Sequence, residues 1–260
     1  SLVRINARAK TSIERAPMDP HSVFQLRPDI DRAFSAYRLW LSQPGQWLTG
    51  ATRVEIARAT RQATQCEACT AFKDHLSARS LDEQHRCCTL LPRDVEVMIH
   101  RIVNDQNRIG PSDIERLEGS LGPIYAYIEL LGIVVCQFSI DEFYRGLALP
   151  EPAWPDPVDG APDGYLPDFL ESETTWVPMI PRDQVQPAEA DLWPGNRGAN
   201  VLRALSAVPN AVRCWQSLSA VMYLSLTGMA EMVQPPNRQL NRMQMELIAG
   251  RVSALNQCLY

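Results

Sequence analysis

The fold of this chain is decided by the stretch Arg53-Val-Glu-Ile-Ala-Arg-Ala-Thr-Arg-Gln-Ala-Thr-Gln-Cys66-Glu-Ala-Cys69, whose pattern begins again as Gln244-Met-Glu246-Leu-Ile-Ala-Gly-Arg-Val-Ser-Ala-Leu-Asn-Gln-Cys258-Leu-Tyr260. Both stretches have helical periodicity, and the second ends one residue short of the position that would match Cys69. Cysteines three residues apart on a helix share a face. The first stretch therefore predicts a dithiol on a helix, which is typical of redox chemistry.

The composition limits the class of protein. The chain has 260 residues, of which 45% are hydrophobic, enough for a packed core, and its net charge is −5. An acidic chain lacks the broad positive surface that phosphate backbones and anionic lipids require. No apolar run approaches the roughly 18 to 20 residues that span a bilayer. We therefore expect a soluble protein with no nucleic-acid and no membrane partner.

The cysteines indicate a reducing compartment. There are seven, an odd number, without the density of a secreted disulfide scaffold. The start Ser1-Leu-Val-Arg has no apolar signal core, and we interpret it as a trimmed end. A cytoplasmic location is expected.

Helical patterns account for most of the chain. Apolar residues at helical spacing predict helices over 28–41, 53–76, from Pro92 onward and over 124–147. The last of these is apolar on most sides, which is typical of a central helix. No alternating apolar pattern of useful length appears between the helices. The predicted fold class is all-α, with the dithiol on the helix over 53–76. If that helix breaks near Thr64-Gln65, a cysteine falls in a first helical turn, where the helix dipole lowers the pKa of a thiol; in an unbroken helix this activation is absent.

The prolines divide the chain. Ten of the 20 prolines fall between Leu149 and Gly198, among acidic residues and three tryptophans. We expect a first helical domain over 22–150, an ordered connector over 151–198 and an incomplete second domain over 199–260. Pro28 and Pro209 each introduce an amphipathic helix followed by a cysteine-bearing one. This order predicts a tandem duplication.

The second copy carries a family resemblance. Its helix text Ile248-Ala-x-Arg-Val-Ser-x-Leu-Asn-x-Cys258-x-Tyr260, with Glu246 twelve residues before the cysteine, resembles the carboxymuconolactone decarboxylase and alkylhydroperoxidase D-like (AhpD-like) family. Residues 137–150 are similar to the helix that closes such a domain. The resemblance covers most of 22–150 and 199–260. It implies a duplicated all-α helical bundle.

The resemblance also implies a catalytic mechanism. Peroxidase-type members have a Glu twelve residues before a CxxC pair and a His four residues after it. One cysteine attacks the peroxide, the other resolves the sulfenic acid to a disulfide, and Glu and His relay protons. In the first copy Cys66 and Cys69 match the pair, whereas Val54 and Lys73 stand at the Glu and His positions.

Other residues are candidates for the missing proton relay. Glu55 adjoins Val54, and His75 lies two residues beyond Lys73, which could itself stabilise a thiolate as a cation. In the second copy Glu246 is the expected proton acceptor beside Cys258. The candidate catalytic residues are therefore Cys66, Cys69, Glu246, Cys258, Lys73, Glu55 and His75.

The resulting hypothesis is an oxidoreductase that reduces peroxides or exchanges thiol and disulfide through its CxxC pair. We expect no organic cofactor and no catalytic metal. A thiol protein would supply the electrons, and a homo-oligomer is expected because AhpD-like members assemble through their helices.

Three alternatives remain open. The domain could be a catalytically decayed scaffold that serves oligomerisation. A lactone decarboxylase is a family-level possibility, although such members generally lack the dithiol. A zinc site is the main rival, because Zn²⁺ binds thiolates and imidazoles; its candidate ligands are Cys66, Cys69, His75, His85, Cys87 and Cys88. Otherwise His75 and His85 are expected to be solvated, and His100 to lie on the surface.

Overall fold

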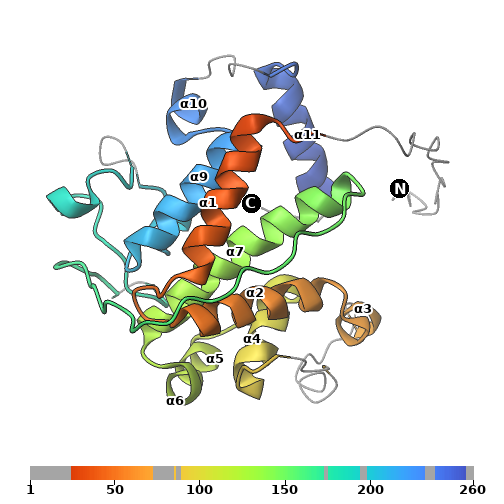
Figure 1. Ribbon diagram of the computed structural model, residues 1–260. Coiled ribbons are helices and arrows are strands. Elements are labelled where there is room, and N and C mark those ends of the chain that lie inside the picture. Colours follow the sequence, from red (N-terminus) through yellow and green to blue (C-terminus); the bar gives the residue numbers. More distant parts are fainter. Residues whose placement is uncertain are drawn as a thin grey trace, which may run out of the picture.

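The predicted all-α class is confirmed. The computed structural model describes residues 25–72, 85, 89–172, 175–193, 198–231 and 238–255. Over these ranges the chain forms helices and irregular segments but no β-strand, and a single isolated bridge joins Glu171 and Met179 (Figure 1).

The helices of the described ranges follow one another in the order of Figure 1. They are α1 (Pro28–Ser42), α2 (Gly50–Thr64), α3 (Glu67–Phe72), α4 (Arg93–Asn104), α5 (Pro111–Glu115), α6 (Glu118–Leu121), α7 (Ile124–Gly146), α8 (Asn200–Arg203), α9 (Pro209–Met222), α10 (Leu226–Glu231) and α11 (Arg242–Leu255). Short 3₁₀ turns cover Gln106–Arg108 and Pro187–Glu189.

Helix α7 is the centre of the fold, as its sequence predicted. It packs against α2, α4 and α9, while α1 packs against α9 and α2. Figure 1 shows α7, in green, between the α1 and α9 pair and the α2 and α4 pair. Ile128, Leu130 and Ile133 of α7 are completely buried. Their burial removes apolar surface from water and holds the surrounding helices together.

The same helix is long and apolar enough to cross a membrane, so the expectation that no run approaches that length was too strict. Its most apolar stretch is 67% buried inside the fold. Such burial is typical of the core helix of a soluble protein. Helix α7 also carries the buried carboxylates Glu129 and Asp141, which face other parts of the protein.

The predicted long helix over 53–76 is wrong, because it breaks just before the dithiol. Helix α2 ends at Thr64, and Gln65 leaves the helical conformation with φ −107° and ψ 8°. Helix α3 then starts anew, with Thr70 N donating to Cys66 O at 3.0 Å. The side chain of Asn104 on α4 donates to Ala63 O at 2.9 Å, and the same carbonyl accepts from Cys66 N at 3.3 Å.

The connector is attached to α2 through Arg61. This guanidinium lies 3.9 Å from the ring centroid of Trp154, and it donates to Pro152 O at 3.3 Å. It also donates to Asp141 on α7, with its Nη2 2.8 Å from Oδ1. One side chain in the last turn of α2 thus joins the connector to the central helix.

The domain boundaries stay a prediction. The main cluster of buried apolar side chains takes members from the first predicted domain, the connector and the second segment, for example Ile133, Ile180 and Val212. Pro28 and Pro209 both occupy the first turn of a helix, and these two helices, α1 and α9, pack against each other. A tandem duplication predicts such equivalent helix starts. The duplication itself stays a prediction.

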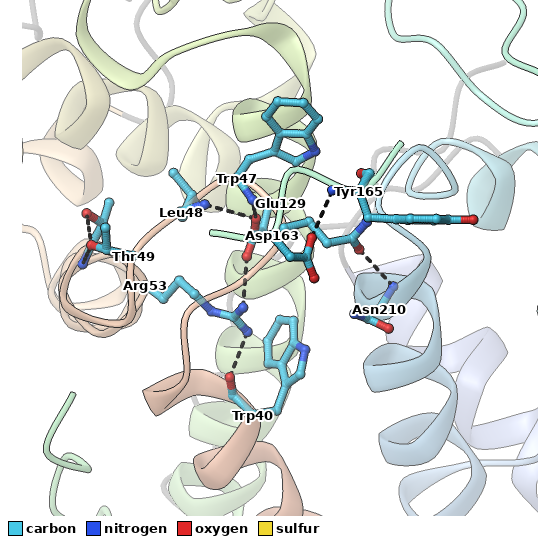
Figure 2. A network of polar contacts seen from close by, with 11 residues as sticks. Trp40, Trp47, Leu48, Thr49, Arg53, Glu129, Asp163, Tyr165 and Asn210 are labelled. Carbon is cyan, nitrogen blue, oxygen red and sulfur yellow. Dashed lines mark hydrogen bonds and ion pairs between the residues drawn. The ribbon is translucent and has the colours of Figure 1, made fainter. Parts of the chain in front are cut away.

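A buried ion pair joins α2 to α7 (Figure 2). Arg53 Nη1 donates to Glu129 Oε1 at 2.9 Å, and both side chains are at most 2% exposed. The other carboxylate oxygen accepts from the backbone N–H groups of Trp47 and Leu48, at 2.7 and 3.2 Å. Burial raises the pKa of Glu129, while Arg53 and the two backbone donors oppose the rise. The pair is therefore stabilised as ions by donors on both carboxylate oxygens.

The guanidinium of Arg53 makes further contacts through its Nη2 and its carbon, although its Nε has no hydrogen-bond partner within the described residues. Its Nη2 donates to Trp40 O at 2.8 Å, and its carbon lies 4.0 Å from the centroid of the Trp40 ring. Arg53 thus fixes the end of α1 against α2, while Glu129 fixes the loop that connects them. The residue at position 45 must be glycine, because an added Cβ would lie 1.7 Å from Glu129 Oε1 and 2.2 Å from Arg53 Nη1.

Replacing Glu129→Gln should lower the free energy of unfolding by about 3–5 kcal/mol, because Arg53 would remain buried without its counter-ion. The amide would also turn its NH₂ group toward one of the donors. Urea denaturation measures the loss. Glu142→Gln on the same helix is the control, because its pair with Arg145 is surface-exposed and should change stability by less than about 1 kcal/mol. Equal effects of the two substitutions would contradict the role of the buried pair.

Gly45→Ala should destabilise the protein by at least about 1–3 kcal/mol, since its methyl group would displace the ion pair. Gly119→Ala is the matched substitution, because nothing lies within 4 Å of its added Cβ. Thermal unfolding compares the two variants. If Gly45→Ala unfolds at the same temperature as the unmodified chain, the loop has room for the methyl group and the prediction is wrong.

Candidate functional site

Two cysteines and two histidines come together where α2, α3 and α4 meet. Cys66 occupies the break before α3, Cys69 lies on α3, His100 lies on α4, and His85 belongs to the segment between α3 and α4. Each offers one sulfur or nitrogen atom, and these four atoms all lie within 4.8 Å of one another. We call these residues the Cys/His cluster.

The contacts within the cluster are close. His85 Nδ1 lies 3.6 Å from the sulfurs of both Cys66 and Cys69, and His100 Nδ1 lies 3.5 Å from the sulfur of Cys69. The two imidazole rings have their centroids 4.3 Å apart. Cys66 is partly exposed, whereas the other three residues are buried. Both thiols are free.

The helix break and Asn104 explain how the cluster is assembled. A continuous helix would carry the chain straight on, but the break at Gln65 starts α3 in a new direction beside α4. Asn104 donates to Ala63 O at the end of α2 and to His100 O within α4, at 2.9 and 3.2 Å. This amide therefore fastens the end of α2 to the helix that carries His100.

The expectations for His85 and His100 were wrong, since the two are only 6% and 3% exposed. His85 was expected to be solvated and His100 to lie on the surface. His100 directly follows Ile99 of the buried stripe of α4, and Glu96, four residues earlier, is 1% exposed. This pair of polar residues beside an apolar stripe was the available signal. Sequence periodicity could not show that cysteines from another helix cover them.

Burial favours the uncharged forms of two cluster residues, Cys69 and His100. It raises the pKa of the Cys69 thiol to about 12, assisted by the hydrogen bond and charge of Cys66. It also lowers the pKa of His100 to about 4, assisted by His85 and opposed by Glu96. Both shifts follow from the cost of placing a charge in a poorly solvated site. At neutral pH the thiol of Cys69 and the imidazole of His100 are therefore neutral.

The structure places the other candidate residues apart from the cluster or leaves them outside the described ranges. Glu55 lies eleven residues before Cys66, about 16 Å along a helix, and it accepts from Leu90 N at 3.1 Å. Glu246 is exposed on α11, where its carboxylate lies 2.7 Å from both Tyr223 Oη and Arg242 Nη2. Residues outside the described ranges are Lys73, His75, Cys87, Cys88 and Cys258.

The larger of the described pockets is separate from this chemistry. It has a volume of about 440 Å³ and lies along α4, α5 and the turn that follows α5. Its lining includes Arg93, Met98 and Asp113 but none of the four cluster residues. The cluster, with its paired sulfurs and adjacent imidazoles, remains the better candidate for chemistry.

Comparisons with known proteins identify no relative. No family model, no curated protein and no solved structure matches the chain. The function must therefore be argued from the residues themselves.

Proposed function

We propose that this chain is a thiol-dependent oxidoreductase of the AhpD-like kind, which reduces peroxides or exchanges thiol and disulfide through Cys66 and Cys69. One observation carries the proposal: each thiol has an imidazole nitrogen within 3.6 Å. A thiol beside a base is the usual arrangement of a cysteine nucleophile. The resemblance of the sequence motif favours the family, and the short distances make the imidazole nitrogens candidate proton acceptors.

The two cysteines have different roles because they differ in exposure. Cys66 is partly exposed, so its thiolate attacks one peroxide oxygen; the O–O bond breaks, Cys66 becomes a sulfenic acid, and an alcohol or water leaves with one proton. Cys69 is buried beside it and attacks the sulfenic sulfur. Water leaves, and a disulfide forms. The two thiols have then given two electrons to the peroxide, and a thiol protein returns them as two thiols of its own become a disulfide.

In this proposal the two histidines serve as the proton relay, which AhpD-like members place at other positions of the sequence. His85 lies 3.6 Å from Cys66 and can accept its proton, and His100 lies 3.5 Å from Cys69. Glu55 on α2 accepts a hydrogen bond from Leu90 N and is the weaker candidate for the proton relay. Lys73 and His75 remain proposed auxiliaries of this site, and Glu246 with Cys258 remains the proposed second site.

The setting of the enzyme is also proposed. Cys66, Cys69, Cys136 and Cys214 are all free thiols, which favours a reducing cytoplasm. Helix α11 exposes several apolar side chains, which favours a homo-oligomer; they include Met243, Leu247, Ile248, Val252 and Leu255. We propose neither nucleic acid nor membrane as a partner.

Cys66→Ser and Cys69→Ser should each abolish the consumption of hydrogen peroxide by metal-free protein in the presence of dithiothreitol. His85→Asn should slow it by about 100-fold or more, because His85 lies beside the attacking thiol of Cys66 and a positioned base typically contributes that much. Mass spectrometry of the unmodified chain after one equivalent of peroxide should show the loss of two hydrogens and a Cys66–Cys69 disulfide.

Cys214→Ser is the control, because this buried thiol lies on α9 and is not part of the cluster. It should consume peroxide at the rate of the unmodified chain. If both cluster cysteines can be replaced without loss of turnover, the activity belongs to another site or the chain is not a peroxidase.

A further inference from the structure

We propose that Cys66, Cys69, His85 and His100 form a four-coordinate zinc site, and that bound zinc holds the dithiol reduced and unreactive. The metal site stands on its own geometry. Only the second part, the effect of zinc on reactivity, rests on the proposed function. The ligands differ from the zinc alternative drawn from the sequence, because His100 joins the set and His75, Cys87 and Cys88 lie outside the described residues.

The distances agree with a tetrahedral zinc ion. Zinc binds thiolate sulfur at about 2.3 Å and imidazole nitrogen at about 2.0–2.1 Å, so that sulfur and nitrogen ligands on a tetrahedron are separated by about 3.6 Å. The three sulfur-to-nitrogen contacts of the cluster measure 3.5, 3.6 and 3.6 Å. All remaining separations are below 4.8 Å, so a small inward movement completes the tetrahedron.

The ligand types select the metal. Two thiolates and two imidazoles are the donors of structural zinc sites, whereas Mg²⁺ and Ca²⁺ require oxygen ligands. Three of the four residues are buried, which limits access of water to the ion. Two thiolates also balance the charge of a divalent ion, so the bound site is neutral overall. With four protein ligands, such a site has no open position for a substrate.

A second observation lies next to His100. Glu96 is 1% exposed, and its Oε1 accepts from Thr89 N at 2.9 Å, whereas its Oε2 has no hydrogen-bond partner within the described part of the chain. The carboxylate lies one helical turn from His100, and its charge acts on that imidazole. Metal-bound histidines usually donate their second N–H to a carboxylate. Glu96 is thus a positioning residue for His100.

Zinc would change the chemistry of the dithiol. A thiolate bound to the ion is not free to attack a peroxide, and the metal-free form is the reactive one. Zinc first has to leave, as the two thiolates take up two protons. The free dithiol then reduces one peroxide molecule to water and alcohol while its two sulfurs join in a disulfide. Zinc release and disulfide formation are therefore expected in equal amounts.

The test uses the full chain, reduced, stripped of metal by a chelator and then titrated with Zn²⁺ or Co²⁺. We expect one ion per chain, and with Co²⁺ the intense visible bands of tetrahedral coordination and a near-ultraviolet thiolate charge-transfer band. Glu96→Gln should weaken zinc binding by about 10–100-fold while leaving the Co²⁺ bands in place. His85→Asn, His100→Asn and Cys69→Ser should each lose the tetrahedral spectrum. Cys214→Ser is the control and should retain both affinity and spectrum.

Circular dichroism of each metal-free variant separates loss of a ligand from loss of the fold. His85→Asn serves as a second variant should His100→Asn unfold, because His85 lies outside the helices of the described ranges. A weak octahedral Co²⁺ spectrum, or binding that survives both histidine substitutions, would overturn the zinc site. Peroxide consumption by the metal-free chain tests the proposed function separately. Consumption at an unchanged rate with zinc bound would overturn the protective role alone.

Discussion

The buried ion pair between Arg53 and Glu129 is the constraint on which the fold depends. Two charges removed from water are costly unless they are paired and hydrogen-bonded. Here the carboxylate takes three donors and the guanidinium reaches both its partner and the end of α1. The short loop over 43–49 has to wrap closely around the pair, with glycine at position 45. These requirements fix α1, α2 and α7 in one arrangement.

That arrangement determines where the thiols lie. Because α2 is anchored to α7 near its beginning and to α4 at its end, the break at Gln65 occurs at a fixed point of the structure. Cys69 then contacts His100 of α4, and His85 lies beside both sulfurs. Packing thus gathers two sulfurs and two imidazoles from separate parts of the chain, three of the four residues being buried.

Local patterns predicted the all-α class, the central helix and the pairing of Cys66 with Cys69, because each depends on residues close in sequence. The break before Cys66 and the burial of His100 depend on contacts across 30 residues or more, which periodicity does not report. The partner of Glu129 was missed for the same reason, since Arg53 lies 76 residues away. Proximity to an apolar stripe was the one local sign that Glu96 and His100 are buried.

The stacking of Trp154 on Arg61 has a mechanical consequence. Arg61 lies in the last turn of α2, one turn before the helix break. It contacts both the proline-rich connector and α7. Tension or displacement in the connector would therefore be transmitted to the turn ahead of Cys66 without any contact to a sulfur atom.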